Sequence, residues 1–325
     1  MKHAVVLNYQ EEVLTIVGAF DAFYEDKKAH GLAKDSLVDY EYTFHYMMNH
    51  FGFDEYTPLT ELTTELFKKW TIEMMEDGKR HSTINRYLRD CKVFLNWCIE
   101  NALFFGQIKI EMVKGQEELV KAFPPEDIIL VTRKPTNKCD FIEWRTWAVT
   151  NWVLATGNRA GTIVNLHIND VDFKTKEIRL RHTKNKKAQV IPLSNALTTI
   201  LREYMRMWRY NSTAEDYLFP NIGNEQLTSD ALQQSFAKYC KKRGSSHTNI
   251  HGLRHTFALN WIRNGGNEFK LQKMLGHSTL EMTRRYVHLA TEDLKEDFES
   301  FSTLDTLHKP KKPVCKVFNN MGRYN

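Results

Sequence analysis

Hydrophobic residues recur at steps of three and four along most of this chain, and this periodicity is what most restricts its fold. Segment 82–104, STINRYLRDCKVFLNWCIENALF, places its apolar residues on one face of a helix and its basic residues on the other. Segment 36–52, SLVDYEYTFHYMMNHFG, starts at a serine, keeps the same period and stops at a glycine. Similar patterns occupy 195–210, 229–243, 252–265, 268–275, 279–286 and 290–301. We therefore expect a mainly helical protein.

One segment departs from this period. In 171–193, VDFKTKEIRLRHTKNKKAQVIPL, apolar and charged residues alternate, and two polar turns, KTK and TKNKK, divide the run. Alternation with a period of two is typical of a strand with one buried face. The segment predicts either a small β-hairpin or a three-stranded sheet inside a helical region.

A weakening of the helical period marks a domain boundary. The period fades after about residue 105, and two prolines follow at 124 and 125. A chain of 325 residues is long enough for two separate cores. We expect a helical domain over 1–110, a linker over 111–123, a second domain over 124–301 that contains the sheet, and a basic, mobile tail over 302–325.

The charge of the chain is unevenly divided. Residues 1–105 hold 11 Lys and Arg against 17 Asp and Glu, whereas residues 106–325 hold 34 against 23. The basic part favours a polyanionic partner, although solubility alone would also explain it. A local basic strip within the acidic part is either a solvated helix face or a contact with the DNA backbone. It consists of Lys79, Arg80, Arg86, Arg89 and Lys92.

The sequence offers no sign of export or of membrane insertion. No run of 18 apolar residues is present, and the first 20 residues lack both an unbroken apolar core and a small-residue cleavage site. The five cysteines are odd in number and widely separated. They predict reduced, mostly buried thiols in a cytoplasmic protein.

The motif HGLRH, residues 251–255, admits two interpretations. His251 and His255 are one helical turn apart, which is the spacing of a helical zinc site, but Gly252 stands where the metalloprotease motif needs a glutamate. His251 and Arg254 would equally form a phosphate clamp on one helix face. The rest of the sequence has to separate the two.

Four segments in a fixed order favour the clamp. They are ATGNRAGTIVNL (155–166), HTKNKKAQVIPL (182–193), HGLRHTFA (251–258) and MLGHSTLEMTRRYVHL (274–289). This set resembles the tyrosine recombinase (phage integrase) family over about residues 10–300. The resemblance implies an α+β catalytic domain, preceded by that family's helical, SAM-like core-binding domain.

The resemblance also implies six catalytic residues, which are Arg159, Lys184, His251, Arg254, His277 and the nucleophile Tyr286. Arginines suit this chemistry because their planar, permanently charged groups stabilise the charge that attack adds to a phosphodiester. A tyrosine hydroxyl, with an ordinary pKa of about 10, needs nearby positive charge or a base. A lysine on a hairpin can protonate the leaving 5′-oxygen. No metal or other cofactor is required.

Two neighbouring residues complete this expectation. His255, offset from His251 and Arg254, is expected to face the core and hold the helix in place, and the resemblance also gives it a structural part. Thr162 stands where the family often has an acidic residue, so the groups that support the site differ.

The implied reaction is cleavage of one DNA strand by Tyr286, which leaves a 3′-phosphotyrosyl link and a 5′-hydroxyl. The partners implied are double-stranded DNA with a specific recombination site, three further copies in a tetramer on two duplexes, and, as an option, an accessory directionality factor. Segment 291–301 is expected to dock on a neighbouring copy or to cap its own domain. The early start of the helical domain leaves no room for an arm-binding domain, which favours the Xer or mobile-element kind.

Two other functions remain open from the sequence. A type IB topoisomerase would share the arginine, lysine and tyrosine chemistry, but the H-x-L-R-H and L-G-H motifs disfavour it. A non-catalytic DNA-binding relative would act in regulation, but it would have little reason to keep all six residues.

Overall fold

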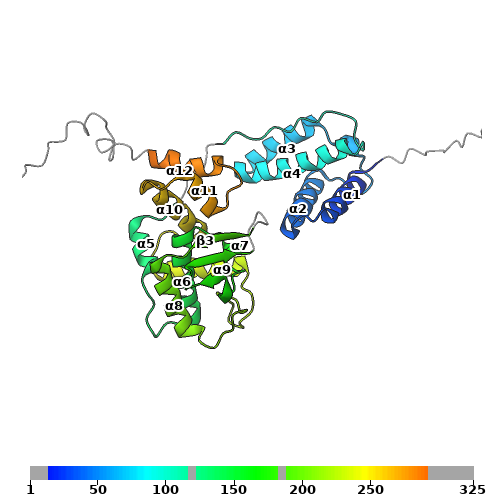
Figure 1. Cartoon of the computed structure of the whole chain (residues 1–325). Coiled ribbons are helices and arrows are strands. Elements are labelled where there is room, and N and C mark those ends of the chain that lie inside the picture. The colour runs from blue at the N-terminus through cyan, green and yellow to red at the C-terminus, as the bar shows by residue number, and fades with distance from the viewer. Residues whose placement is uncertain (1–13, 116–121, 182–187, 292–325) are drawn as a thin grey trace, which may run out of the picture. The chain divides into compact units, whose positions relative to one another are not determined.

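The computed structural model describes residues 14–115, 122–181 and 188–291, and the chain divides into two compact units, Met1–Glu118 and Leu119–Asn325. Helices dominate both units, and the described part of the second contains a small sheet (Figure 1). The predicted fold class, mainly helical with a small β-sheet, is confirmed. The division lies within the segment predicted as a linker, whereas the predicted tail, 302–325, lies outside the described residues.

Unit 1 is helical throughout its described part. Its elements are α1 (Ile16–Ala29), α2 (Lys34–Phe51), the 3-10 helix η1 (Leu59–Glu61), α3 (Thr64–Glu76) and α4 (His81–Glu100). The side chains of Thr15 and Thr63 accept backbone N–H groups of the first turns of α1 and α3, as N-caps do. Helix α2 ends at Gly52, whose φ of 65° lies in the left-handed region that favours glycine.

Helix α4 supplies the central face of the unit 1 core. The predicted buried stripe is buried, and it comprises Ile84, Tyr87, Leu88, Cys91, Phe94, Leu95 and Cys98. The rings of Phe20 and Phe44, from α1 and α2, stack beside it with centroids 3.8 Å apart. The helix stops at Glu100 rather than at 104, because Ala102 has a φ of 56° that an α-helix cannot continue.

Unit 2 combines helices with the sheet. Its helices are α5 (Pro125–Thr132), α6 (Phe141–Thr156), α7 (Ala160–Ile163), the 3-10 helix η2 (Ile168–Asp170), α8 (Asn195–Trp208), α9 (Ser229–Lys242), α10 (Ile250–Arg263), α11 (Glu268–Leu275) and α12 (Glu281–Thr291). Its strands are β1 (Val171–Asp172), β2 (Glu177–Leu180) and β3 (Gln189–Pro192). Most predicted helices are therefore present, with ends shifted by at most five residues and with both ends of the predicted helix 268–275 matched by α11.

The sheet has three antiparallel strands in the order β1-β2-β3, which decides between the two predicted arrangements. Ile178 of β2 pairs with Val171 on one side and Ile191 on the other. Ile178 and Leu180 are buried while the residues between and before them are exposed, as the alternating pattern predicts.

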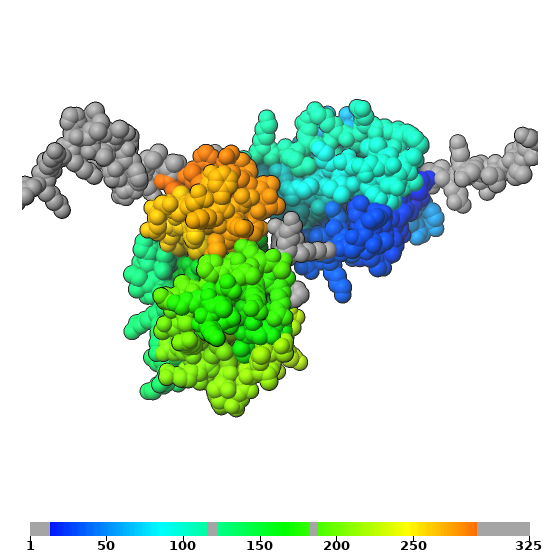
Figure 2. All heavy atoms as spheres, viewed as in Figure 1, coloured from blue at the N-terminus to red at the C-terminus, as the bar shows by residue number. Residues whose placement is uncertain are grey.

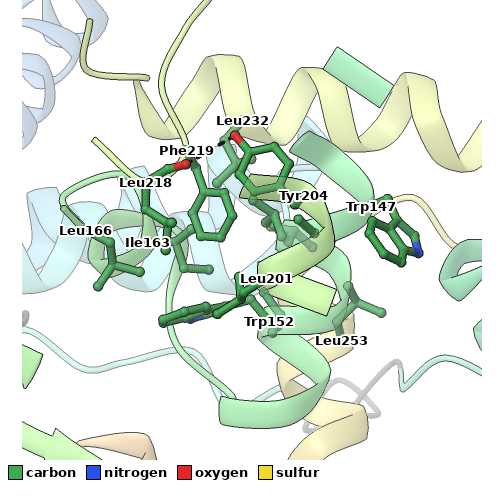
Figure 3. Close-up of a cluster of buried hydrophobic side chains, with 14 of the residues drawn as sticks. Trp147, Trp152, Ile163, Leu166, Leu201, Tyr204, Leu218, Phe219, Leu232 and Leu253 are labelled. Atoms are coloured by element: carbon green, nitrogen blue, oxygen red, sulfur yellow. Dashed lines mark hydrogen bonds between the residues drawn. The ribbon is translucent and has the colours of Figure 1, made fainter. Parts of the chain in front are cut away.

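The core of unit 2 forms around α6, which is buried on all sides. Figure 3 shows Trp152 of this helix among Leu201, Tyr204 and Leu253, which come from α8 and α10. Tyr204 is fully buried, and its hydroxyl donates to the backbone oxygen of Leu218 at 3.1 Å, so its polar end keeps a partner. Because α6 is packed on all sides, its C-terminal end at Thr156 is fixed in place, and the turn that leads to α7 begins there.

Helices α10, α11 and α12 form a second, smaller cluster of unit 2. Figure 2 shows their atoms, coloured yellow to orange, together at one end of the unit. The apolar side chains that hold them include Phe257, Leu271, Leu275 and Tyr286. Helix α12 covers most of the segment predicted as 279–286 and continues to Thr291, whereas the segment predicted as 290–301 lies almost wholly outside the described residues.

Two sequence expectations concern the whole chain. In the described ranges, no helix is both long and apolar enough to cross a membrane. Cys91, Cys98 and Cys240 are buried thiols and Cys139 is half-buried, in agreement with the prediction, while Cys315 lies outside the described residues.

Candidate active site

Gly157 sets the path of the chain from α6 to Arg159. Its φ is 66°, and a Cβ there would lie 2.5 Å from Phe257 Cδ1 and 2.7 Å from Leu275 Cδ2. The turn therefore needs glycine both for its backbone conformation and for space. Asn158 is buried beside it and accepts a hydrogen bond from the Trp152 indole at 3.0 Å. Arg159 then occupies the N-cap of α7.

Arg254 is the most enclosed charge of the site, with 2% of its surface exposed. Its Nη1 donates to the backbone oxygen of Gly157 at 2.6 Å, and its Nη2 donates to that of Leu275 at 2.9 Å. Nη2 also lies 2.9 Å from Nε2 of His277. One side chain thus ties together the ends of α6 and α11 and His277, which lies two residues beyond α11.

Arg159 reaches the same place from α7. Its Nη1 donates to the Leu275 oxygen at 3.4 Å, so both guanidinium groups share one acceptor. Burial and, to a smaller extent, the charge of Arg159 lower the pKa of Arg254 to about 9, so Arg254 is still charged at neutral pH. Burial also lowers the pKa of Arg159. Neither has a carboxylate partner among the described residues. Two adjacent cations without a counter-charge favour binding of an anion.

His277 is fixed by its neighbours in one tautomer. It follows Gly276, which ends α11 with a φ of 61°. Because Arg254 can only donate, Nε2 of His277 must accept, and Nδ1 therefore carries the proton. That proton is directed to Oγ1 of Thr283 at 2.9 Å. Burial is the main cause that lowers the pKa of His277, and the charges of Arg254 and Arg159 add to it. The pKa falls to about 4, so the ring is neutral at pH 7.

Tyr286 enters the site from α12. Its side chain is 4% exposed, and its ring lies parallel to that of His277 with centroids 6.5 Å apart. Burial raises the pKa of its hydroxyl, while Arg254, Arg285 and Arg159 act in the opposite direction. The predicted nucleophile is thus close to the predicted anion-binding groups, and its proton is retained at neutral pH.

The expectation that His255 faces the core is wrong. This residue does not turn away to the core, because its Nδ1 lies 2.8 Å from the Tyr286 hydroxyl. Residues four apart on a helix lie on the same face, so His255 stays on the side of α10 that carries His251. Their rings meet edge to face with centroids 4.6 Å apart.

His251 is the most exposed member of the group. It lies in the first turn of α10, where its backbone N–H donates to the side chain of Asn249 at 2.9 Å. Partial desolvation lowers its pKa, and Arg254 and Arg159 add to this effect. Its exposed ring can contact a molecule that binds over the two arginines.

The remaining predicted catalytic residue, Lys184, lies outside the described residues, in the sequence that joins the two strands of the β2–β3 hairpin. The described base of that hairpin is tied to the site. Gln189, the first residue of β3, donates from its side chain to the backbone oxygen of Lys273 in α11. The start of β3 therefore lies beside α11, the helix that precedes His277.

The zinc interpretation gains no support from this geometry. Among the described residues, no three His, Cys, Asp or Glu side chains form a group able to hold a metal ion. His255 is instead directed at Tyr286, and Arg254 lies beside it. The surroundings of the HGLRH motif suit an anion better than a cation.

The basic strip of unit 1 is divided in two. Arg86 pairs with Asp39 at 2.6 Å and lies over the ring of Tyr87, and Lys79 lies 5.1 Å from the centroid of the Tyr46 ring. The other three members, Arg80, Arg89 and Lys92, are exposed. These three are the ones available to a large polyanion.

A cavity of about 570 Å³ lies elsewhere in unit 2. It is lined mainly by α6, α9 and residues 221–227, and none of the six predicted catalytic residues borders it. The candidate site is therefore marked by convergent charged side chains and not by an enclosed cavity, as suits a ligand too large to be enclosed.

Comparison with known proteins identifies the family. The model of the phage integrase family matches residues 129–293, just over half of the chain. A tyrosine recombinase XerC of Chlamydia caviae is 29% identical over 251 residues, which are 74% of this chain and 80% of the relative. A tyrosine recombinase XerA of Saccharolobus solfataricus is 27% identical over 250 residues, 73% of this chain and 78% of the relative.

Solved structures of similar fold agree. The Tn1549 transposon integrase in complex with transposon right end DNA has a TM-score of 0.67 at 18% identity, covering 86% of this chain and 98% of that one. A lambda integrase tetramer bound to a Holliday junction has a TM-score of 0.67 at 14% identity, covering 85% and 78%. The resemblance drawn from the motifs is thereby confirmed, and the chain belongs to the phage integrase family of tyrosine recombinases.

Proposed function

We propose that this chain is a site-specific DNA recombinase that cleaves and rejoins DNA through a 3′-phosphotyrosyl link to Tyr286. The observation that carries the proposal is the convergence of Arg159, Arg254, His277 and Tyr286 on one site of unit 2. Membership of the phage integrase family and similarity to XerC and XerA recombinases support the same reaction.

The two arginines would hold the scissile phosphate. Among the described residues, no carboxylate pairs with either guanidinium group, so the phosphate would bring the negative charge that they lack, and attack adds further charge to its non-bridging oxygens. Groups held in place before the reaction stabilise that charge without reorganising. Arg254 suits this role because its hydrogen bonds to Gly157 and Leu275 fix its orientation. His251 is the further contact to the phosphate, and His277 helps to hold Arg254 through the hydrogen bond between them.

The step proceeds by attack of the Tyr286 oxygen on phosphorus as the bond to the 5′-oxygen breaks. The leaving 5′-oxygen needs a proton, and Lys184 is the proposed donor. The reverse attack by a 5′-hydroxyl of a partner duplex restores the phosphodiester and releases Tyr286. The bond energy is kept in the protein–DNA ester, so no nucleotide cofactor is consumed.

Recognition would use both units. Arg80, Arg89 and Lys92 of unit 1 are the proposed backbone contacts, and phosphate contacts supply most of the affinity of such complexes. A lambda integrase of similar fold was solved as a tetramer on a Holliday junction, and an XerH recombinase of similar fold was solved on its difH substrate. By analogy, we propose that this chain also assembles as a tetramer on two duplexes and acts on a mobile element or a replicon inside the cell.

The proposal is tested by covalent trapping. Purified protein is incubated with EDTA on nicked suicide duplexes built from DNA that flanks its own gene, and Tyr286→Phe is run beside it. The expected result is a protein–DNA adduct from the wild type and none from the variant, with equal gel retardation. Retardation without an adduct from either protein would favour a non-catalytic DNA-binding protein, and an equal adduct from both would exclude Tyr286 as the nucleophile.

A further inference from the structure

Thr283 is a fully buried residue of the site to which the proposed reaction gives no part. It lies in the first turn of α12, three residues before Tyr286, so the two side chains lie on the same face of that helix. Its backbone N–H donates to the oxygen of Leu280 at 2.8 Å, and its Oγ1 lies 2.9 Å from Nδ1 of His277. The hydroxyl is therefore withdrawn from water and directed at the imidazole.

Arg254 fixes the direction of the hydrogen bonds on both sides of His277. A guanidinium can only donate, so Nε2 of the ring, 2.9 Å from Nη2 of Arg254, must accept. A neutral imidazole has one N–H group, which is then on Nδ1 and donates to Thr283. Thr283 thus acts as an acceptor, and each bond along the three side chains has one possible direction.

The backbone of His277 is held independently of its ring. Its N–H donates to the backbone oxygen of Gln272 at 3.1 Å, and the Gln272 amide donates to the His277 oxygen at 3.3 Å. The ring can still rotate about its side-chain bonds, so the partners of its two nitrogens set its orientation. Without Thr283, a half-buried N–H would lose its acceptor, and rotation of the ring toward water would relieve the cost. That rotation would carry Nε2 away from Arg254.

The orientation of the Arg254 guanidinium depends in turn on this ring. Nη2 has two N–H groups, one for the backbone oxygen of Leu275 and one for His277, while Nη1 uses one for Gly157. These bonds use three of the five N–H groups, and the other two can face a phosphate. Donors that are in place before the reaction stabilise the developing charge best, so a turn of this guanidinium would slow cleavage.

We propose that Thr283 is a positioning residue for strand cleavage: by accepting the Nδ1 proton of His277, it holds the ring that orients Arg254 toward the scissile phosphate. This inference rests on the proposed function. It means that one helix, α12, supplies both the nucleophile Tyr286 and the last support of Arg254. The support is complete only while α12 is packed on α10 and α11, so the anion-binding group and the nucleophile are brought into place together.

The discriminating variants are Thr283→Val and Thr283→Ser. Valine has the shape of threonine but no acceptor, whereas serine keeps the hydroxyl. Adduct formation on the nicked duplexes is measured in single turnovers at increasing protein concentration, which separates the cleavage rate of the bound complex from the affinity. We expect Thr283→Val to lower that rate by roughly 10- to 100-fold, the range found when the group that orients a metal-ligating histidine is removed. The affinity should not change, because many other phosphate contacts supply it. Thr283→Ser should keep most of the rate.

A double-mutant cycle with His277→Ala distinguishes positioning from a general effect on the fold. If Thr283 acts through the ring of His277, removal of that ring leaves the hydroxyl nothing to orient. Thr283→Val should then change the rate of the His277→Ala protein by no more than about twofold, the scatter of independent measurements. A structural effect on α12 would instead slow both backgrounds by the same factor.

Thr150→Val is the matched control. Thr150 is also fully buried, but its hydroxyl donates to the backbone oxygen of Thr146 at 2.7 Å within α6. This variant should lower the melting temperature without slowing cleavage. A Thr283→Val rate equal to that of the wild type, an equally slow Thr283→Ser, or an additive cycle would each overturn the role of Thr283 alone. A wild type that binds DNA but forms no adduct would instead overturn the proposed function, and this role with it.

Discussion

At the scale of single residues, the site depends on a glycine as much as on its charges. Gly157 provides the left-handed turn before Arg159, and its backbone oxygen accepts from Arg254. Both arginines are therefore positioned by a residue that has no side chain. The neighbours that leave no room for a Cβ, Phe257 and Leu275, are the same residues that pack the cluster beneath Tyr286.

Gly157→Ala should impair both stability and cleavage. The left-handed conformation costs an alanine about 1–2 kcal/mol, and overpacking against Phe257 and Leu275 adds about 1–3 kcal/mol. We expect a melting temperature lower by several degrees, together with slower adduct formation. Gly161→Ala is the matched control, because its added Cβ would meet no atom closer than 3.8 Å. Equal melting curves for the two variants would contradict this account of the turn.

At the scale of secondary-structure elements, α10 is held by the segment that leads into and begins α5. The carboxylate of Asp127, in the first turn of α5, accepts from the Ser246 hydroxyl at 2.8 Å and from the backbone N–H of His247 at 3.1 Å. The Thr256 hydroxyl of α10 accepts the backbone N–H of Phe123 at 2.8 Å. These bonds hold the segment before α10 and the middle of α10, and the first turn that carries His251 lies between them.

Asp127 should make the fold sensitive to acid. Burial alone would raise the pKa of its carboxyl, but hydrogen bonds from Ser246 and His247 outweigh burial and lower the pKa to about 2. Since the folded-state pKa is below the unfolded value of 3.8, this stabilisation is complete above about pH 4 and is lost as the pH falls through 2.

Asp127→Asn removes the charge of the carboxylate and places an amide N–H group, itself a donor, beside the donors of Ser246 and His247. It should therefore lower the free energy of unfolding by about 1–3 kcal/mol at pH 7. The loss should shrink between pH 4 and pH 2, as measured by chemical unfolding. The exposed neighbour Glu126 provides the control, as Glu126→Gln on the same helix. A constant difference between Asp127→Asn and wild type across this pH range would refute the assignment.

At the scale of the whole molecule, the division of charge predicts how DNA affinity responds to salt. Arg80, Arg89 and Lys92 are exposed on unit 1, whereas Lys79 and Arg86 lie against tyrosine rings. If the three exposed groups each neutralise one phosphate, their joint replacement releases about three fewer counterions.

The triple variant Arg80→Ala, Arg89→Ala and Lys92→Ala should lower the slope of log K against log salt by about 2.7. Affinity is measured by fluorescence anisotropy between 50 and 200 mM salt. A control with the same change of charge replaces Lys28, Lys68 and Lys69, which are exposed on α1 and α3. Equal slopes for both triple variants would mean that the strip on α4 does not contact the backbone.

The sequence alone determined the class of fold and the motifs of the family. The period of hydrophobic residues depends on local geometry, so it gave the buried face of α4, the sheet and most helix positions. Helix ends were less well predicted, because α4 stops at a left-handed residue, Ala102, that no local pattern marks. The order of the motifs identified the phage integrase family, since six reactive residues at set positions are specific together.

Tertiary structure decided how those residues meet. The sequence placed His255 in the core, yet the packing of α12 on α10 brings the Tyr286 hydroxyl to its ring. Nothing local links residues 31 positions apart, and a helix face is defined only when its neighbour is known. The tautomer of His277 likewise follows from Arg254 and Thr283, which three-dimensional packing supplies. The sequence specified the chemical groups, and the packing of helices assigned their partners.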